Sequence, residues 1–252
     1  MSTEIFVCTH KKFKYGLPFG YRILQVGASL NADLGYLRDD NGENISMKNH
    51  NYCELTGLYW VWKNVTSDYV GLVHYRRYFY KSRIAAVAND PLSVAYIEKQ
   101  LKYYDIILPK KFKYNNTMRE IYERDHNIKD LLLLRDILKI KYPKYIPAFD
   151  EMCMSREAYL YNMFCCKREL IDEYCTWLFD LLFELEKHVD ISSYDRYNQR
   201  IYGFLSERLF NVWLIFHKYR VKECYVYNIE ADSMFGQAIR YPLHCYLKKI
   251  FS

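Results

Sequence analysis

Two arginines and a histidine follow directly on a short apolar run in the first half of the chain. The run Tyr69–Val73 predicts a buried strand, and His74, Arg76 and Arg77 come straight after it. The carboxyl end of a strand in an open α/β sheet lies at the crevice where ligands bind, and arginine forks match the paired oxygens of phosphates and carboxylates. The spacing therefore predicts an anion site, with an exposed basic turn ahead of aromatic core residues as the competing interpretation.

Polar and basic residues also end two other predicted strands, over residues 4–10 and Tyr104–Pro109. These residues are Thr9, His10, Lys11, Lys110 and Lys111. Because strand ends in such a sheet gather at one edge, they are further candidates for contacts with an anionic ligand. For Thr9, a capping or surface role is the alternative.

The elements that must hold these side chains alternate between strands and helices. Strands are predicted over residues 4–10, 23–26, 69–73, 104–109, 159–167 and 220–227. Helices are predicted from Asn51 through Trp62 and over residues 92–104, 117–141 with a break, 168–187 and 195–216. Pro143 and Pro147 are predicted to end the helix over residues 117–141. This alternation predicts an α/β fold of the Rossmann kind in the broad sense, a sheet covered by helices, with a helical C-terminal part from about residue 168.

The helix that opens near Asn51 carries a recognisable start signal and an apolar face. Asn51 is predicted to cap it, with Glu54 three residues further on as in a capping box. Four large residues recur at helical spacing, namely Tyr52, Leu55, Tyr59 and Trp62. Such a face is typical of a helix packed on the core rather than of a ligand site.

Length and composition exclude several classes of protein. The 252 residues contain no Pro/Gly/Ser-rich linker, which favours a single domain over residues 1–252. The net charge of +6 is modest for a nucleic-acid binder, and neither GxGxxG after the first strand nor GxxxxGK[ST] occurs, which disfavours dinucleotide enzymes and P-loop nucleotidases. The 27 tyrosines suit stacking on sugars and bases, and equally suit an irregular core.

The cysteines and the apolar runs bear on the compartment. None of the eight cysteines has CxxC spacing, so a zinc or redox site of that kind is not expected. The chain shows neither a signal-peptide pattern nor an apolar run of roughly 18 to 20 residues that could span a membrane. We therefore expect free thiols and a cytoplasmic protein.

Five segments of the chain, taken together and in order, are similar to a known family. They are residues 5–11, 51–64, 69–79, 104–109 and 203–213. They resemble the bacterial family catalogued as domain of unknown function 4422, whose members occur in capsule, exopolysaccharide and O-antigen clusters and are regarded as glycosyltransferases. The resemblance covers roughly residues 4 to 230. It implies a GT-A-like fold, a hexosyltransferase of the EC 2.4 type using a sugar-nucleotide donor such as a UDP-sugar, and galactofuranosyl transfer in some members.

This resemblance gives the strand ends more specific expected roles. Most GT-A enzymes hold a divalent metal at the donor diphosphate with an Asp-x-Asp motif, and no such triplet occurs here. We expect Arg76 and Arg77 to contact the diphosphate without a metal cofactor, since arginines supply the same electrostatic stabilisation. One of them in a structural ion pair is the alternative. His74 could donate to a phosphate or ligate a metal. The acidic loop with Asp39 and Asp40 keeps the use of a divalent metal such as manganese as an alternative.

Other residues receive donor-side roles from the same resemblance. The end of the first strand, with Thr9, His10 and Lys11, usually meets the nucleobase or ribose in GT-A-like folds. Further candidates for donor contacts are Lys110, Lys111, Arg200 and Arg208.

Transfer with inversion also requires a carboxylate that removes the proton from the acceptor hydroxyl. Glu207 is the first candidate, with Arg200 seven residues earlier on the same expected helix face and Arg208 next to it. A buried Glu–Arg pair that holds the helix is the competing interpretation. Asp150, beside Glu151, is the second candidate base.

The acceptor implied by the resemblance is a lipid-linked saccharide at the inner face of the membrane. The basic aromatic segment Tyr241–Phe251 could lie on anionic lipid, which would make the protein peripheral there. A C-terminal helix packed on the domain is the alternative. A non-catalytic sugar-nucleotide-binding component of a polysaccharide assembly complex is the competing function, and no nucleic-acid partner is expected.

Overall fold

Alternating side chains of the first strand pack against two different sets of helices. The computed structural model describes residues 2–13 and 16–230. Within β1 (Thr3–Thr9), Ile5 and Val7 pack into one buried cluster, while Phe6 and Cys8 pack into the other. Successive strand residues point to opposite faces of a sheet, so this pattern requires cover on both sides.

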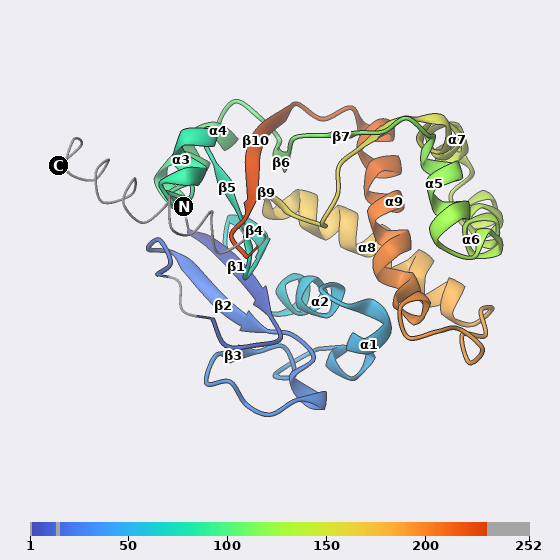
Figure 1. Cartoon of the computed structure of the whole chain (residues 1–252), viewed down its shortest axis with the longest axis horizontal. Coiled ribbons are helices and arrows are strands. Elements are labelled where there is room, and N and C mark those ends of the chain that lie inside the picture. The colour runs from blue at the N-terminus through green and yellow to red at the C-terminus, as the bar shows by residue number, and fades with distance from the viewer. Residues whose placement is uncertain (1, 14–15, 231–252) are drawn as a thin grey trace.

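The central sheet of the described chain has eight strands in the order β3-β2-β1-β4-β5-β10-β6-β9 (Figure 1). Besides β1 they are β2 (Tyr21–Gln25), β3 (Leu37–Arg38), β4 (Tyr69–His74), β5 (Arg77–Tyr80), β6 (Ile106–Pro109), β9 (Phe164–Lys167) and β10 (Val221–Asn228). β1, β2, β3 and β4 run parallel, while β9 pairs antiparallel with β4 and β6. A separate ladder joins β7 (Phe112–Lys113) to β8 (Glu157–Ala158).

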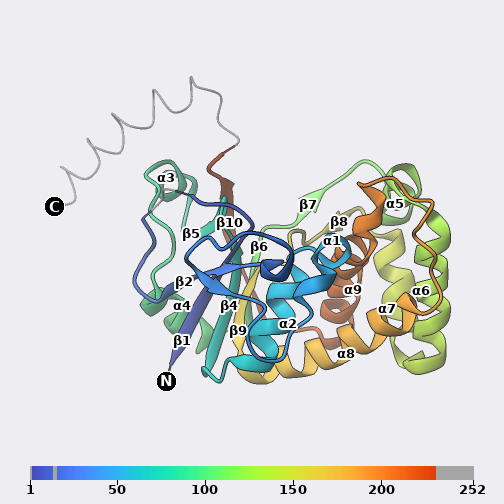
Figure 2. The same ribbon diagram turned by 90° about the horizontal axis from the view of Figure 1, so that it is seen from below.

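Helices cover both faces, as the view from below shows (Figure 2). On one side lie α3 (Arg83–Val87) and α4 (Val94–Leu101). On the other lie α1 (Asn49–Tyr52), α2 (Leu55–Asn64), α8 (Arg168–Glu186) and α9 (Ile201–His217), and beyond them α5 (Met118–Asp125), α6 (Ile128–Lys141) and α7 (Ile146–Met154). Gly57 allows α2 to approach closely, because an added Cβ would lie 2.8 Å from the sulfur of Cys8. The predicted α/β sheet covered by helices is confirmed.

The predicted capping box at Asn51 is wrong. The helix is interrupted at Cys53, whose φ of 51° and ψ of −130° separate α1 from α2. The side-chain amide of Asn51 donates instead to the carbonyl oxygen of Gln199, and that of Asn49 donates to the carbonyl of Cys53. Contacts distant in the sequence thus override the local start signal.

Three other boundaries differ from the prediction. The strand predicted over 159–167 begins only at Phe164, because Tyr161 and Asn162 form a left-handed turn with φ of 79° and 49°. The last long helix begins at Ile201 rather than at residue 195. Pro147 does not end a helix but stands in the first turn of α7, where proline is tolerated. The short strand β5 was not predicted, since its alternation is hidden among aromatic residues.

Candidate functional site

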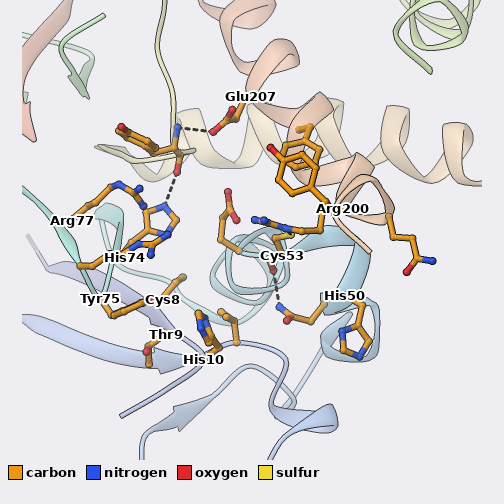
Figure 3. A pocket seen from close by; sticks show the side chains of 18 of the residues that line it. Cys8, Thr9, His10, His50, Cys53, His74, Tyr75, Arg77, Arg200 and Glu207 are labelled. Atoms are coloured by element: carbon orange, nitrogen blue, oxygen red, sulfur yellow. Dashed lines mark hydrogen bonds between the residues drawn. The ribbon is translucent and has the colours of Figure 1, made fainter. Parts of the chain in front are cut away.

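A pocket of about 1150 Å³ opens at the carboxyl ends of β1 and β4 (Figure 3). The sheet edge contributes Cys8, Thr9, His10, Val26, His74, Tyr75, Arg76 and Arg77. The α1–α2 turn contributes Asn49, His50, Cys53 and Glu54, and the opposite wall contributes Tyr161, Arg196, Tyr197, Gln199, Arg200, Phe204 and Glu207. The structure therefore gathers residues from six separate parts of the sequence. Among the residues that the sequence offered as candidates, those that line this pocket are Thr9, His10, His74, Arg76, Arg77, Arg200 and Glu207.

Four arginines line this pocket, two from each wall. Arg76 and Arg77 follow β4, which pairs with β1 so that His74 lies beside Cys8. Arg196 and Arg200 belong to the segment before α9. Across residues 2–13 and 16–230, none of the four forms an ion pair. Unpaired positive charge in a concave site attracts anions.

Aromatic rings hold two of these guanidinium groups in place. The guanidinium carbon of Arg77 lies 4.3 Å from the ring centre of Tyr161, and that of Arg200 lies 5.4 Å from Phe204. Cation–π contacts orient a guanidinium without neutralising it. Both groups thus keep their charge available to a ligand in the pocket.

His74 is fixed by a backbone carbonyl. Its Nε2 lies 2.6 Å from the carbonyl oxygen of Tyr161. Because a carbonyl can only accept, Nε2 carries the proton, and burial lowers the pKa of His74, with Arg77 and Arg76 acting in the same direction. The ring is therefore neutral near pH 7 with its proton already engaged, so it links the end of β4 to the turn before β9 rather than offering that proton to a phosphate.

Glu207 lies at the pocket with both carboxylate oxygens occupied. Oε1 accepts the backbone N–H of Tyr161 at 2.8 Å, and Oε2 lies 3.2 Å from Nη1 of Arg208. Burial raises the pKa of Glu207, and the nearby charge of Glu54 raises it further. The Glu–Arg pair expected as the competing interpretation is present, although Glu207 also lines the pocket.

Glu54 is a pocket residue that sequence reasoning assigned to helix capping. Its Oε1 accepts a hydrogen bond from Nδ2 of Asn162 at 2.9 Å. Its position depends on the sharp turn at Cys53, for which the sequence carries no signal. Arg200 reaches the same turn, where its Nε donates to the sulfur of Cys53 at 3.1 Å. Burial raises the pKa of the Cys53 thiol to about 11, so this sulfur stays protonated.

Comparison with known proteins places the chain in a family. The family model described as Domain of unknown function (DUF4422) matches residues 4–218. The chain belongs to this family. None of the curated proteins matches it. The solved structure of WbbM, a bifunctional glycosyltransferase without ligand, is similar, with 30% sequence identity and a TM-score of 0.84.

The match covers 92% of this DUF4422 chain and 46% of WbbM, so the chain spans less than half the length of that relative. Likeness at this level shows that the mixed sheet and its covering helices form a GT-A-like fold. In such α/β folds ligands bind outside the carboxyl ends of the strands, which is where the pocket of this family member lies.

Several predicted residues of this DUF4422 chain do not line the pocket. Lys11 pairs with Glu230 at 3.0 Å, and Lys111 pairs with Glu157 at 2.6 Å. Lys110 lies over the ring of Tyr225. Lys110 and Lys111 follow β6, which pairs with neither β1 nor β4, and Lys11 lies two residues beyond the end of β1.

Two residues predicted from the helical part also lie elsewhere. Asp150 stands on α7 rather than before a strand, and it forms a two-pronged ion pair with Arg135 at 2.7 and 2.8 Å. The guanidinium of Arg208 points away from the pocket, toward the ring of Tyr122 at 5.3 Å. Arg208 therefore acts on the pocket only through Glu207.

The acidic loop with Asp39 and Asp40, which the sequence offered as a possible metal site, makes structural hydrogen bonds and an ion pair. Asp39 is fully buried and accepts four hydrogen bonds, from the backbone of Gly27 and Ala28 and the hydroxyls of Ser46 and Thr56. Asp40 pairs with Arg38. Within the described ranges, no group of three His, Cys, Asp or Glu side chains could hold a metal ion. Asp39 thus connects β2 to the start of α2 and stabilises one wall of the pocket.

The wall opposite the sheet edge is aromatic. Tyr197 is 53% exposed, and Phe204 stacks on His126 with ring centres 4.1 Å apart. Tyr197 lies 5.0 Å from Phe204, and Nδ1 of His126 bonds Asn198. These contacts hold a flat apolar surface beside Arg200.

Among the residues that the structure describes, none of the helices combines the length and the apolar character that a membrane span requires.

Proposed function

We propose that this protein is a glycosyltransferase that moves a sugar from a UDP-sugar donor to a saccharide acceptor during synthesis of a bacterial surface polysaccharide. The observation that carries the proposal is the set of four arginines in one pocket at the strand ends, none of which forms an ion pair with another residue within 2–13 or 16–230. The similarity to WbbM, a glycosyltransferase over a chain twice as long, supports it. Galactofuranose is the transferred sugar that we expect from the family resemblance.

In the proposed reaction the diphosphate of the donor lies against Arg76 and Arg77. Their forks stabilise the negative charge that develops as the diphosphate leaves. Thr9 and His10, at the end of β1, then face the nucleoside. Arg200 adds positive charge from the opposite wall.

The acceptor saccharide occupies the aromatic wall. The ring of Tyr197 is exposed at the pocket, and aromatic faces suit the apolar faces of sugar rings. The expected acceptor is lipid-linked, and the segment Tyr241–Phe251, which lies outside the described residues, is the proposed membrane contact. Co-sedimentation with anionic vesicles, with and without that segment, tests this part of the proposal.

The experiment for the donor site is a thermal-shift titration with UDP-sugars, since a ligand that binds only the folded state raises the apparent stability. We expect UDP-galactofuranose to raise the Tm of the wild type and to do so much less in Arg76→Ala and Arg77→Ala. Arg83→Ala, at an exposed position outside the pocket, is the matched control. A wild-type Tm that no UDP-sugar raises contradicts the proposal, and binding without transfer to any saccharide favours the non-catalytic sugar-nucleotide-binding role.

A further inference from the structure

Two carboxylates face the pocket, and they differ in what their oxygens contact. Glu207 has one oxygen on the N–H of Tyr161 and the other beside the guanidinium of Arg208. Glu54 has one oxygen on the amide of Asn162, while its Oε2 accepts no hydrogen bond from any residue that the structure describes. A carboxylate oxygen must be free to receive a proton, so Glu54 is the better placed of the two.

Glu54 also lies close to ionisable groups on the other walls of the pocket. Its charge acts on five neighbouring groups, namely Cys8, Cys53, His74, Arg200 and Glu207. These groups belong to β1, the α1–α2 turn, β4 and the start of α9. Glu54 also lines the pocket, so it is exposed to the space where the proposed donor and acceptor would meet.

The backbone around Glu54 is held in a costly conformation. Cys53 has a positive φ without being glycine, an unfavourable conformation that persists only where surrounding contacts enforce it. Those contacts are the amide of Asn49 on the Cys53 carbonyl and the Nε of Arg200 on its sulfur. They direct the next residue, Glu54, to the pocket at the N-cap position of α2, where a negative charge is favoured by the helix dipole.

We propose that Glu54 is the general base of the transfer reaction and that Glu207 is a positioning residue; this inference rests on the proposed function. Oε2 of Glu54 takes the proton from the acceptor hydroxyl while the acceptor oxygen bonds to the anomeric carbon of the donor. The bond from that carbon to the diphosphate oxygen breaks, and its electron pair leaves with the diphosphate beside Arg76 and Arg77. The protonated Glu54 then releases its proton to water.

Glu207 acts through the turn before β9 in this proposal. Its Oε1 accepts a hydrogen bond from the backbone N–H of Tyr161. The carbonyl oxygen of Tyr161 accepts a hydrogen bond from His74, and the side-chain amide of the next residue, Asn162, donates one to Glu54. A neutral amide can still accept the N–H of Tyr161. Glutamine at position 207 therefore keeps the geometry, whereas glutamine at position 54 keeps the bond to Asn162 but cannot take a proton.

This difference defines the experiment. Transfer from a UDP-sugar to a saccharide is measured for the wild type, Glu54→Gln and Glu207→Gln, with donor affinity measured separately by calorimetry using UDP. We expect Glu54→Gln to lower kcat by about 10²–10⁴-fold, the contribution of a general base, with the Kd for UDP unchanged. Glu207→Gln is expected to lose far less, and added formate is expected to restore part of the kcat of Glu54→Ala.

Each result bears on a different claim. Wild-type kcat in Glu54→Gln, or a loss in Glu207→Gln equal to that in Glu54→Gln, overturns the assignment of the base and leaves the proposed function standing. A wild-type protein that binds no UDP-sugar and transfers none overturns both. A Glu54→Gln variant that loses UDP binding along with turnover shows a donor contact rather than a base, which also overturns the inference.

Discussion

The Nε2 nitrogen of His74 lies 2.6 Å from the carbonyl oxygen of Tyr161 and joins the end of β4 to the turn before β9. The peptide of the same residue donates its N–H to Glu207, and Asn162 holds Glu54. One left-handed turn therefore positions an imidazole and two carboxylates. Damage to this turn is expected to affect all three groups together.

Asn162→Ala is expected to destabilise the protein by about 2–3 kcal/mol. The substitution removes the hydrogen bonds to Glu54 and Ser206 and places a less tolerant residue at a φ of 49°. Urea unfolding of both proteins measures the change. Asn162→Gly is the matched control, because it accepts the same φ and isolates the lost hydrogen bonds. Equal stability of the alanine variant and the wild type would show that the turn is not under strain.

Arg77→Lys is expected to weaken UDP binding by about tenfold although the charge is kept. An ammonium group lacks the planar fork that contacts two oxygens at once and stacks less well on the ring of Tyr161. Calorimetry with UDP at low and high salt checks this. The remaining affinity should fall as salt rises, because it depends on exposed charge. An unchanged Kd would place the diphosphate elsewhere.

Glu207 is expected to make the stability depend on pH. Burial raises its pKa in the folded protein above the ordinary value of 4.5, so between these two values the unfolded chain loses its proton first. Stability is then favoured below pH 4.5 and falls as the pH rises toward the folded pKa. In Glu207→Gln this dependence of stability on pH should be absent. The free energy of unfolding of the variant should therefore rise relative to that of the wild type from ~pH 5 to ~pH 7. Parallel unfolding curves at both pH values would contradict the raised pKa.

Asp39→Asn is expected to destabilise the protein by at least about 2 kcal/mol. An amide nitrogen cannot accept the hydrogen bonds that one carboxylate oxygen receives in the buried site, and donors left without a partner are costly. Asp33→Asn, at an exposed position, serves as the control. The Tm of the wild type should also be unaffected by EDTA. A Tm that EDTA lowers and manganese restores would assign Asp39 to a metal instead.

The alternation of strands and helices was predictable because each element follows from local spacing. The apolar run of β4 and its basic end predicted His74, Arg76 and Arg77 as candidate site residues, and the five ordered segments indicated the family. Strand ends of a parallel sheet converge for general geometric reasons. The pocket edge formed by β1 and β4 was therefore accessible from the sequence alone.

The sequence by itself determined the order of the main strands and helices, the family and the basic residues at the end of β4, since these depend on local pattern. Only the tertiary structure decided that Glu54 faces the pocket, that Lys110 and Asp150 do not, and that Arg208 pairs with Glu207. Lys110 and Asp150 are held elsewhere by contacts with Tyr225 and Arg135. The positions of Glu54 and Glu207 at the pocket depend instead on two backbone conformations, at Cys53 and at Tyr161–Asn162. Both are unfavourable locally and are held by hydrogen bonds from residues far away in the chain.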